Sequence, residues 1–268
     1  MAKEVKTIGV LTSGGDAPGM NAAIRAVVRS AESVGMECIG IRRGWKGLIN
    51  GDIVRMNEDS VAHIINRGGT CLYTARSEEF RTKEGREKAY LTCKLLGIDG
   101  LVAIGGDGTF AGCLAFAEEH DISVIGIPAT IDNDIGCTHY SIGYDTAANT
   151  ALDSIDKLRD TMQSHERCSV VEVMGHRAGN LALYVGIAAG ATAVLVPEEK
   201  WDFEKDVAEK IRRARLAGRT HYMIVVAEGA TSACQVAEKI KKSLGLDPRL
   251  TILGHVQRGG NPNARDRV

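Results

Sequence analysis

The sequence predicts an α/β fold with two Rossmann-like, three-layer domains, each built around a mostly parallel sheet. The first observation behind this prediction is a series of short apolar runs that are continuous rather than alternating, as is typical of parallel strands covered on both faces. The second is that longer amphipathic segments separate these runs. This β–α–β order favours parallel sheets with helices on both faces.

The apolar runs predict strands which, in chain order, are residues 7–12, 38–42, 100–104, 124–127, 169–174, 193–197, 222–227 and 250–254. The amphipathic segments predict helices over residues 21–33, 83–96, 110–119, 146–163, 203–217 and 232–244. Glycines fall just beyond several helix ends, where a left-handed cap favours them: Gly35, Gly97, Gly218 and Gly245. We expect the long helix over 146–163 to join the two sheets. This places residues 1–143 and 257–268 in one domain and 144–256 in the other.

The composition is ordinary for a globular protein and excludes several classes of partner. The 268 residues carry a formal net charge of −1, which gives no reason to expect nucleic acid or an anionic membrane as a partner. The N-terminus has no apolar signal core, and no stretch is long and apolar enough to span a bilayer. We therefore expect a cytoplasmic protein.

The seven cysteines lie apart, without a C-x-x-C pair, at positions 38, 71, 93, 113, 137, 168 and 234. This spacing suits neither a disulfide framework nor a zinc site. We expect them to be small buried hydrophobic residues in a reducing compartment.

Two glycine-rich loops, residues 12–21 and 105–109, each follow an expected strand and precede a helix. Glycines let backbone N–H groups approach an anion, and the positive end of the helix favours it. The first loop matches neither G-x-G-x-x-G nor a Walker A motif, so a tight structural turn explains it equally well. In the second, Asp107 fits a magnesium ligand better than a turn residue. That loop also suits lipid kinases and NAD kinases, so it indicates a chemistry but no substrate.

A third loop, residues 128–134, follows the apolar run 122–127, which we expect to be a buried parallel strand. It carries two carboxylates and a hydroxyl at the edge where open α/β sheets bind ligands. One of these carboxylates, Asp132, can take a proton from a substrate hydroxyl. Together the three loops suggest a kinase that acts on a small molecule.

Arginine and histidine side chains at strand ends are candidates for holding a phosphate group. Arg258 and His255 lie beside glycines after the last expected strand, where the guanidinium fork suits phosphate. Arg167 lies in a polar turn before the strand 169–174, and Arg249 precedes the last strand. Taken alone, each is better explained by a solvated surface charge.

With these motifs, the chain resembles the bacterial ATP-dependent 6-phosphofructokinases. The shared motifs lie in the family's order over nearly the whole chain, at residues 9–25, 65–70, 104–108, 130–134, 170–175 and 254–260. The residues alone indicate a phosphoryl transferase. The resemblance implies a phosphofructokinase-like fold, a nucleotide-binding first domain and a sugar-phosphate-binding second one. It also implies transfer from ATP, with Mg²⁺, to the 1-hydroxyl of fructose 6-phosphate in glycolysis, by a homotetramer.

The resemblance assigns roles on the donor side of this reaction. It implies that Asp132 is the general base, that Thr130 orients the transferring phosphate, and that Asp134 is also catalytic. It implies that Asp107 holds Mg²⁺ and that Arg76 lies near the transferring group. The residues implied to contact the nucleotide are Gly15, Arg76, Ser77, Gly106, Asp107, Gly108 and Thr109.

On the acceptor side, the resemblance implies a clamp on the sugar's 6-phosphate made by Arg167, Arg249, His255 and Arg258. In the family the first two arginines reach in from a neighbouring subunit, which implies an oligomer. Glu228 is implied to bind a sugar hydroxyl and Met174 to pack on the sugar. The other residues implied to contact this substrate are Thr130, Ile131, Asp132, Gly175, His176, Val256 and Gln257.

The chain departs from the family's usual pattern at the sugar site. His176 stands where the family usually has arginine, and Arg177 follows it. On a strand the next side chain points to the other face, so Arg177 is not expected to compensate. We expect slower chemistry or weaker sugar binding.

The family's nucleotide effector site is also altered. It keeps Arg25, Arg29, Arg159 and Arg219, but Glu58, Thr192 and Ala217 replace a cation, a metal-binding acid and a lysine. We expect weak nucleotide regulation. Family members also continue for some tens of residues past the last residue here, and the sequence leaves open whether the chain is a fragment or a shortened protein.

Two other functions remain open at this point. The first is a pyrophosphate-dependent phosphofructokinase, although members of that type typically carry Asp where Gly108 stands and Lys where Ala129 stands. The second is a degenerate subunit that binds sugar phosphate without turnover. His176 and the missing C-terminal segment favour this second alternative, whereas the intact Asp107, Asp132 and Asp134 oppose it.

Overall fold

The structure, a computed structural model, describes residues 5–136 and 138–268 and confirms the predicted α/β fold. Contacts between residues divide the chain into two compact units. Unit 1 comprises Met1–Thr130, Ile135–Gly143 and Arg258–Val268, and unit 2 comprises Ile131–Asp134 and Tyr144–Gln257. The assignment of one domain to the nucleotide and of the other to the sugar phosphate stays a prediction.

Unit 1 is built on a five-stranded sheet in the order β3-β2-β1-β4-β5. Its strands are β1 (Thr7–Ser13), β2 (Glu37–Ile41), β3 (Ile53–Met56), β4 (Gly100–Gly105) and β5 (Ser123–Pro128). Neighbours pair in parallel except β3, which is antiparallel to β2. The sequence analysis missed β3 because it is a four-residue edge strand without a long apolar run.

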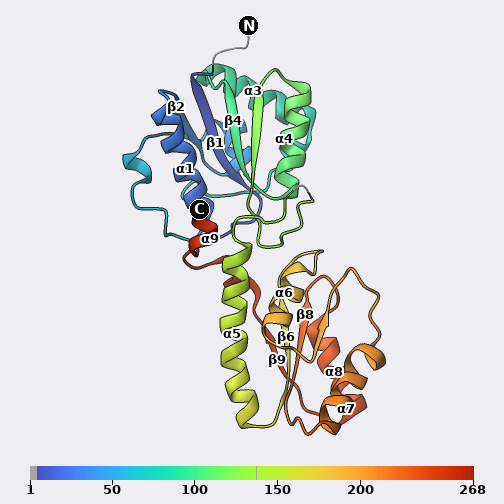
Figure 1. Cartoon of the computed structure of the whole chain (residues 1–268). Helices are drawn as coiled ribbons and strands as arrows, with labels where there is room; N and C mark the ends of the chain where they lie inside the picture. Colours follow the sequence, from blue (N-terminus) through green and yellow to red (C-terminus); the bar gives the residue numbers. More distant parts are fainter. Residues whose placement is uncertain (1–4, 137) are drawn as a thin grey trace. The chain divides into compact units, whose positions relative to one another are not determined.

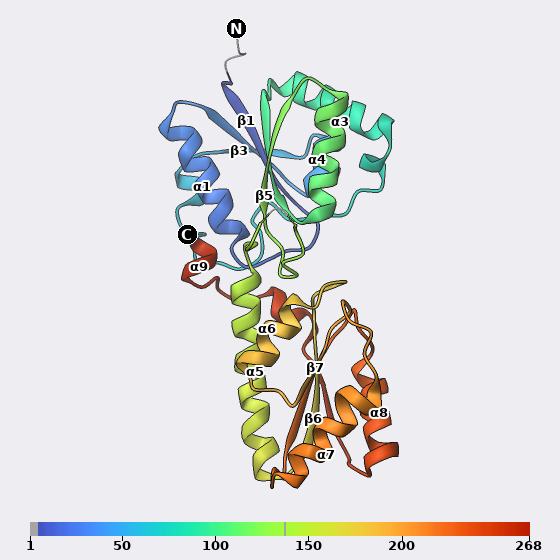
Figure 2. The same cartoon turned by 45° about the vertical axis from the view of Figure 1, so that its right-hand side comes forward.

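The helices of unit 1 are α1 (Met20–Ser33), α2 (Gly44–Asn50), α3 (Lys83–Leu96), α4 (Asp107–Glu119) and the short α9 (Ala264–Arg267). Figures 1 and 2 show α1 on one face of the sheet and α3 and α4 on the other. The core on the second face includes Trp45 stacked on Phe80, with ring centroids 4.2 Å apart. Packing on both faces explains why β1 and β4 are continuous apolar runs.

Unit 2 is built on a four-stranded parallel sheet in the order β7-β8-β6-β9. Its strands are β6 (Cys168–Val173), β7 (Ala193–Leu195), β8 (Tyr222–Ala227) and β9 (Arg249–Ile252). Its helices are α5 (Tyr144–Ser164), α6 (Asn180–Ala188), α7 (Glu209–Leu216) and α8 (Ala233–Leu244). In Figure 1, α5 and α6 lie on one face of this sheet and α7 and α8 on the other. Helix α6 was missed because its sequence, NLALYVGIA, is apolar all round and shows no amphipathic period.

Several element predictions are confirmed to within a few residues, and helix α3 shows why. It begins after Thr82, whose Oγ1 accepts a hydrogen bond from the Gly85 N–H over 3.1 Å. It ends at Gly97, which has a φ of 66° in the left-handed region. The helix expected over 203–217 is less regular, because a wider turn over Glu204–Ala208 precedes α7.

The expectation that the run 122–127 is a buried strand is wrong. Strand β5 is the edge of the unit 1 sheet, and Ile125 is 65% exposed. A continuous apolar run cannot distinguish a central strand from an edge strand, because both can have the same local sequence.

The prediction that the cysteines are buried holds for only some of them. Burial raises the pKa of Cys38 to about 11 and the pKa of Cys93 and Cys168 to about 12, so these thiols stay protonated near neutral pH. Cys71 and Cys234 are exposed, which corrects the prediction for these two. Cys137 lies outside the described residues. Among the described residues, no helix is both long enough and apolar enough to cross a membrane.

Candidate active site

The carboxyl ends of three neighbouring strands in unit 1 lie level with one another. Ser13, the last residue of β1, pairs with Gly105 of β4, and Gly105 pairs with Pro128 of β5. The loops that follow these strands therefore begin side by side at one edge of the sheet. These are the two glycine loops and the start of the 128–134 loop, so the fold brings the predicted donor-side loops together.

Direct contacts join these loops. Thr109 Oγ1 donates a hydrogen bond to the Ser13 carbonyl oxygen over 3.0 Å, and the Ala129 N–H donates to the Gly105 carbonyl oxygen over 2.9 Å. A Cβ atom on Gly105 would lie 2.4 Å from the Ser13 oxygen, so only glycine fits between the loops. Thr109 is thus buried and holds the loops together, and its contact with the nucleotide, which the resemblance implies, stays a prediction.

Helices α1 and α4 both begin at this edge with a glycine cap. Gly19 precedes α1 and Gly106 precedes α4, and neither start has a side-chain cap. A helix start offers N–H groups without partners inside the helix, together with the positive end of the helix dipole. Both helices therefore present their backbone donors at the edge where the loops meet, as binding of a phosphate requires.

Asp107 and Gly108 occupy the exposed first turn of α4. A Cβ atom on Gly108 would meet no atom within 4 Å, so this position faces open space. Among the described residues, no group of three or more His, Cys, Asp or Glu side chains could hold a metal ion. A single accessible carboxylate still fits Mg²⁺, because this ion is usually held by one or two carboxylates plus substrate phosphates and water.

The segment that contains Arg76 and Ser77 is attached to the first glycine loop. Thr74 Oγ1 donates a hydrogen bond to the Gly14 carbonyl oxygen over 2.6 Å. Ser77 Oγ accepts a hydrogen bond from the Phe80 N–H over 3.2 Å, so its hydroxyl hydrogen can point to a ligand. The Arg76 side chain is exposed.

Sequence reasoning missed Asn21 as an anchor of this region. Its buried side chain donates to the carbonyl oxygens of Arg67 and Gly68 over 3.0 and 3.1 Å. Its Oδ1 accepts a hydrogen bond from the Cys71 N–H over 2.7 Å. The sequence did contain a signal for this role, because Asn21 is a polar residue at the second position of helix α1, on the face that packs inward.

Arg258 lies against the first glycine loop. Its Nη1 donates a hydrogen bond to the Asp16 carbonyl oxygen over 3.2 Å. A Cβ atom on Gly15 would lie 2.6 Å from the same Nη1 atom, so Gly15 leaves room for the guanidinium group. The sequence placed Arg258 only on the sugar phosphate, and the structure adds this contact with the donor loop.

In unit 2, residues 131–134 are held at the start of α6. The Asn133 carbonyl oxygen accepts a hydrogen bond from Asn180 Nδ2 over 2.8 Å, and Asn133 has a left-handed φ of 50°. Ile131 and Asp132 are buried, with Asp132 8% exposed, whereas Asp134 is exposed. Of the two carboxylates, only Asp132 therefore sits in a shielded position suited to a general base.

The carboxyl edge of the unit 2 sheet gathers several predicted substrate residues. The Met174 N–H donates to Gln257 Oε1 over 3.4 Å, and the His176 N–H donates to Glu228 Oε1 over 2.8 Å. Glu228 follows β8, which pairs with β6. His255 and Val256 are exposed in a short helical turn, Gly254–Arg258, after β9.

The argument that strand alternation turns Arg177 away is wrong, because β6 ends at Val173. Residues 175–178 form a turn in which the Ala178 N–H donates to the Gly175 carbonyl oxygen over 2.8 Å. Gly175 and His176 have φ values of 140° and 53°, so neither is in an extended conformation. The glycine before His176 was the local signal for this turn.

Arg167 and Arg249 lie at the opposite, amino edge of the unit 2 sheet. Arg167 immediately precedes β6, and Arg249 is the first residue of β9 and pairs with Ser169. The six residues of β6 separate this edge from the carboxyl edge. At about 3.3 Å per residue, that separation is roughly 20 Å. Within unit 2, these arginines are therefore not brought together with Met174, His176 and Glu228.

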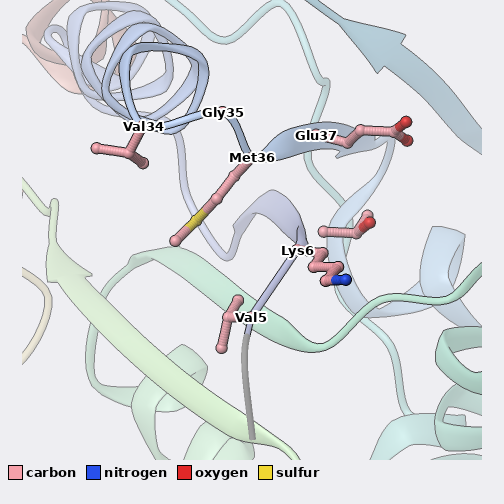
Figure 3. Close-up of a pocket in the computed structure, with 7 residues that line it drawn as sticks. Val5, Lys6, Val34, Gly35, Met36 and Glu37 are labelled. Carbon is pink, nitrogen blue, oxygen red and sulfur yellow. The ribbon is translucent and has the colours of Figure 1, made fainter.

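A surface pocket in unit 1 lies away from these loops (Figure 3). It is lined by Val5, Lys6, Thr7, Val34, Gly35, Met36 and Glu37, where β1 and β2 begin and α1 ends. This is the amino edge of the sheet. Figure 3 shows the side chains of Val34 and Met36 on one side of it and those of Lys6 and Glu37 on the other. None of the predicted site residues lines this pocket.

The two parallel sheets, with glycine loops at the carboxyl edge of the first, define a class of α/β protein that binds phosphorylated ligands at strand ends. Comparison with known proteins identifies the family. The family model for Phosphofructokinase matches residues 7–268. The chain belongs to the phosphofructokinase family.

Individual relatives agree with this assignment. The chain is 56% identical over 266 residues to the ATP-dependent 6-phosphofructokinase 1 of Thermus thermophilus, covering 98% of this chain and 82% of that protein. The phosphofructokinase structure from Saccharomyces cerevisiae superposes with a TM-score of 0.92 at 38% identity, covering 98% of this chain and 40% of that one.

A pyrophosphate-dependent phosphofructokinase from Marinobacter aquaeolei also superposes, with a TM-score of 0.84. It covers 98% of this chain and 72% of that one, at 22% identity. At this level of identity, the similarity shows the shared fold alone. It gives no support to pyrophosphate as the donor for this chain.

Proposed function

We propose that this chain is an ATP-dependent 6-phosphofructokinase that transfers the γ-phosphoryl group of ATP to the 1-hydroxyl of fructose 6-phosphate. The observation that carries the proposal is the level register of Ser13, Gly105 and Pro128, which places three ligand-binding loops at one sheet edge. The 56% identity to an ATP-dependent relative supports ATP as the donor. We further propose a homotetramer in the cytoplasm.

In this proposal, the starts of α1 and α4 bind the donor phosphates, with Arg76 and Ser77 from the neighbouring segment. Asp132 takes the proton of the sugar's 1-hydroxyl as that oxygen bonds to the γ-phosphorus, and ADP leaves with the bridging oxygen. Mg²⁺ held by Asp107 supplies positive charge to the phosphates when bound. Catalysis of this kind depends mainly on positioning and on charge stabilisation.

Glu228, Met174, His176 and the turn at His255 supply the sugar-binding side in this proposal. Arg167 and Arg249 complete the phosphate clamp from a neighbouring subunit. Their position at the amino edge of their own sheet supports this part of the proposal, since roughly 20 Å separates them from that sugar-binding edge.

The test is production of fructose 1,6-bisphosphate with ATP or with pyrophosphate as donor. We expect turnover with ATP only. Gly108→Asp should lower kcat/KM for ATP about tenfold or more, because it adds a charged group in the open space beside the phosphates, whereas Gly108→Ala should have little effect. A preference for pyrophosphate would establish the alternative donor. Binding of fructose 6-phosphate without turnover would favour the degenerate subunit.

A further inference from the structure

Residues 140–143 of unit 1, called the return segment here, run back beside the loop that follows β5. The Ile142 N–H donates a hydrogen bond to the Pro128 carbonyl oxygen over 2.9 Å, and Ile142 forms an isolated bridge with Ala129. Ser141 Oγ donates to the Thr130 carbonyl oxygen over 2.5 Å. Ser141 is only 1% exposed, so water does not compete strongly for this bond.

The return segment supports the loop at the point where the sheet stops. Strand β5 is an edge strand, and its pairing with β4 ends at Pro128. One more bond, from the Ala129 N–H to Gly105, ties the loop to β4. The bond from Ser141 then fixes the next peptide, between Thr130 and Ile131. This peptide leads directly to Asp132.

The C-terminal turn holds the return segment in place. Asp266, which is 3% exposed, accepts a hydrogen bond from the Gly143 N–H at its Oδ1 over 2.9 Å. The Arg265 guanidinium lies 3.4 Å from the centroid of the Tyr140 ring. Both ends of the return segment are therefore attached to the short helix α9.

The start of α1 packs against both the return segment and helix α9. A Cβ atom on Gly19 would lie 2.4 Å from the Ile142 side chain and 2.6 Å from the Asp266 carbonyl oxygen. Gly19 also has a φ of 113°, which favours glycine. The return segment is thus fitted between the start of a proposed phosphate-binding helix and the Thr130 loop.

We infer that Ser141 is a positioning residue for Thr130 and that Asp266 supports it through Gly143. The inference rests on the proposed function, in which Thr130 orients the transferring phosphoryl group. The Thr130 side chain packs against Gly106, since a Cβ atom added to Gly106 would lie 3.5 Å from Thr130 Cβ. Rotation of the Thr130 peptide would shift this side chain relative to the start of α4. A misplacement of this kind reduces the enzyme's stabilisation of the transition state more than its binding of the ground-state substrates. It therefore lowers kcat rather than raising KM.

The test is a double-mutant cycle in the full chain. We expect Ser141→Ala to lower kcat about tenfold with both KM values within about twofold, because small misplacements near reacting groups have large effects on rate. Ser141→Thr keeps the hydroxyl and should restore most of the rate. In a Thr130→Ala background, Ser141→Ala should change kcat less than about twofold, since its effect acts through Thr130.

The matched control is Ser154→Ala, which removes a hydroxyl that donates to the Thr150 carbonyl oxygen over 2.8 Å within α5. Its kcat should stay within about twofold of the unaltered chain. Thermal unfolding of every variant separates loss of fold from loss of rate. If Ser141→Ala does not fold, the cycle is run with Asp266→Ala, and Asp266→Asn, which keeps an acceptor for Gly143, should restore the rate.

The outcomes separate this inference from the proposed function. The positioning role would be overturned if Ser141→Ala lowered kcat by the same factor in the unaltered chain and in the Thr130→Ala background. It would also be overturned if Ser141→Ala raised a KM and left kcat unchanged. Either result would leave the proposed function intact. Absence of turnover by the unaltered chain would instead overturn the proposed function, and the positioning role with it.

Discussion

The two sheets of this protein use their edges differently. In unit 1, the glycine loops, Asp107 and Thr130 all follow the carboxyl ends of adjacent strands, whose register is level. In unit 2, Met174, His176 and Glu228 also lie at the carboxyl edge, but Arg167 and Arg249 lie at the amino edge. The predicted donor-side loops are thus gathered at one edge of the unit 1 sheet. In unit 2, by contrast, Arg167 and Arg249 lie at the opposite sheet edge from the other predicted sugar-binding residues.

The largest expected effect comes from removing the proposed general base. Asp132→Ser should lower kcat by ~10²-fold or more, with little change in fructose 6-phosphate binding, because loss of a general base acts on the transition state. Steady-state kinetics and direct binding of the sugar phosphate measure the two effects separately. Asp121→Asn, an exposed carboxylate on the loop before β5, is the control. Near-normal turnover by the Ser variant would remove Asp132 from this role.

The next largest expected effect is on the KM for fructose 6-phosphate, and it comes from removing Arg249 at the amino edge of the unit 2 sheet. Arg249→Ala should raise the KM for fructose 6-phosphate roughly 10- to 150-fold, the equivalent of about 1.5–3 kcal/mol for a charge-assisted contact. Mixing Arg249→Ala subunits with Asp132→Ser subunits should recover activity at low sugar phosphate, because some sites would then combine two intact halves. No recovery after verified subunit exchange would show that each chain uses its own Arg249.

Substitution of Arg258 tests whether one residue serves both the predicted ATP-binding loops and the predicted sugar-phosphate clamp. Its guanidinium contacts the Asp16 carbonyl oxygen in the donor loop, whereas its proposed ligand is the sugar phosphate. Arg258→Ala should raise the KM for fructose 6-phosphate about tenfold, with a smaller rise in the KM for ATP through the loop. Arg258→Lys retains the charge without the fork and should show an intermediate effect. A rise in the KM for ATP alone would assign Arg258 to the donor side.

The smallest expected effect concerns nucleotide regulation. Glu58 pairs with Arg29 over 2.5 Å, so it engages one of the arginines that the family uses for an anionic effector. Both side chains are about half exposed, and such ion pairs are worth up to about 1 kcal/mol. Saturation curves for fructose 6-phosphate should therefore shift less than about twofold with ADP or phosphoenolpyruvate, and Glu58→Gln should increase the shift. A strong ADP response in the unaltered chain would contradict this reading.

Sequence reasoning was accurate where the signal is local. The family and fold are confirmed, and helix α3 spans Lys83–Leu96 as predicted, with Gly97 just beyond its end. It failed where the signal depends on neighbours. The exposed edge position of β5 and the uniformly apolar α6 have local sequences that resemble buried elements. The roles of the individual site residues stay predictions.

The sequence by itself determined the α/β class, most of the strands and helices, the glycine loops and the family, because periodicity, caps and motifs each depend on a few neighbouring residues of the chain. Only the tertiary structure decided that Ser13, Gly105 and Pro128 end level, that Arg249 lies at the opposite sheet edge from Glu228, and that Ser141 bonds to Thr130. These relations depend on strand register and on packing between distant segments. No local pattern encodes them, because each is set by which surfaces can be buried together.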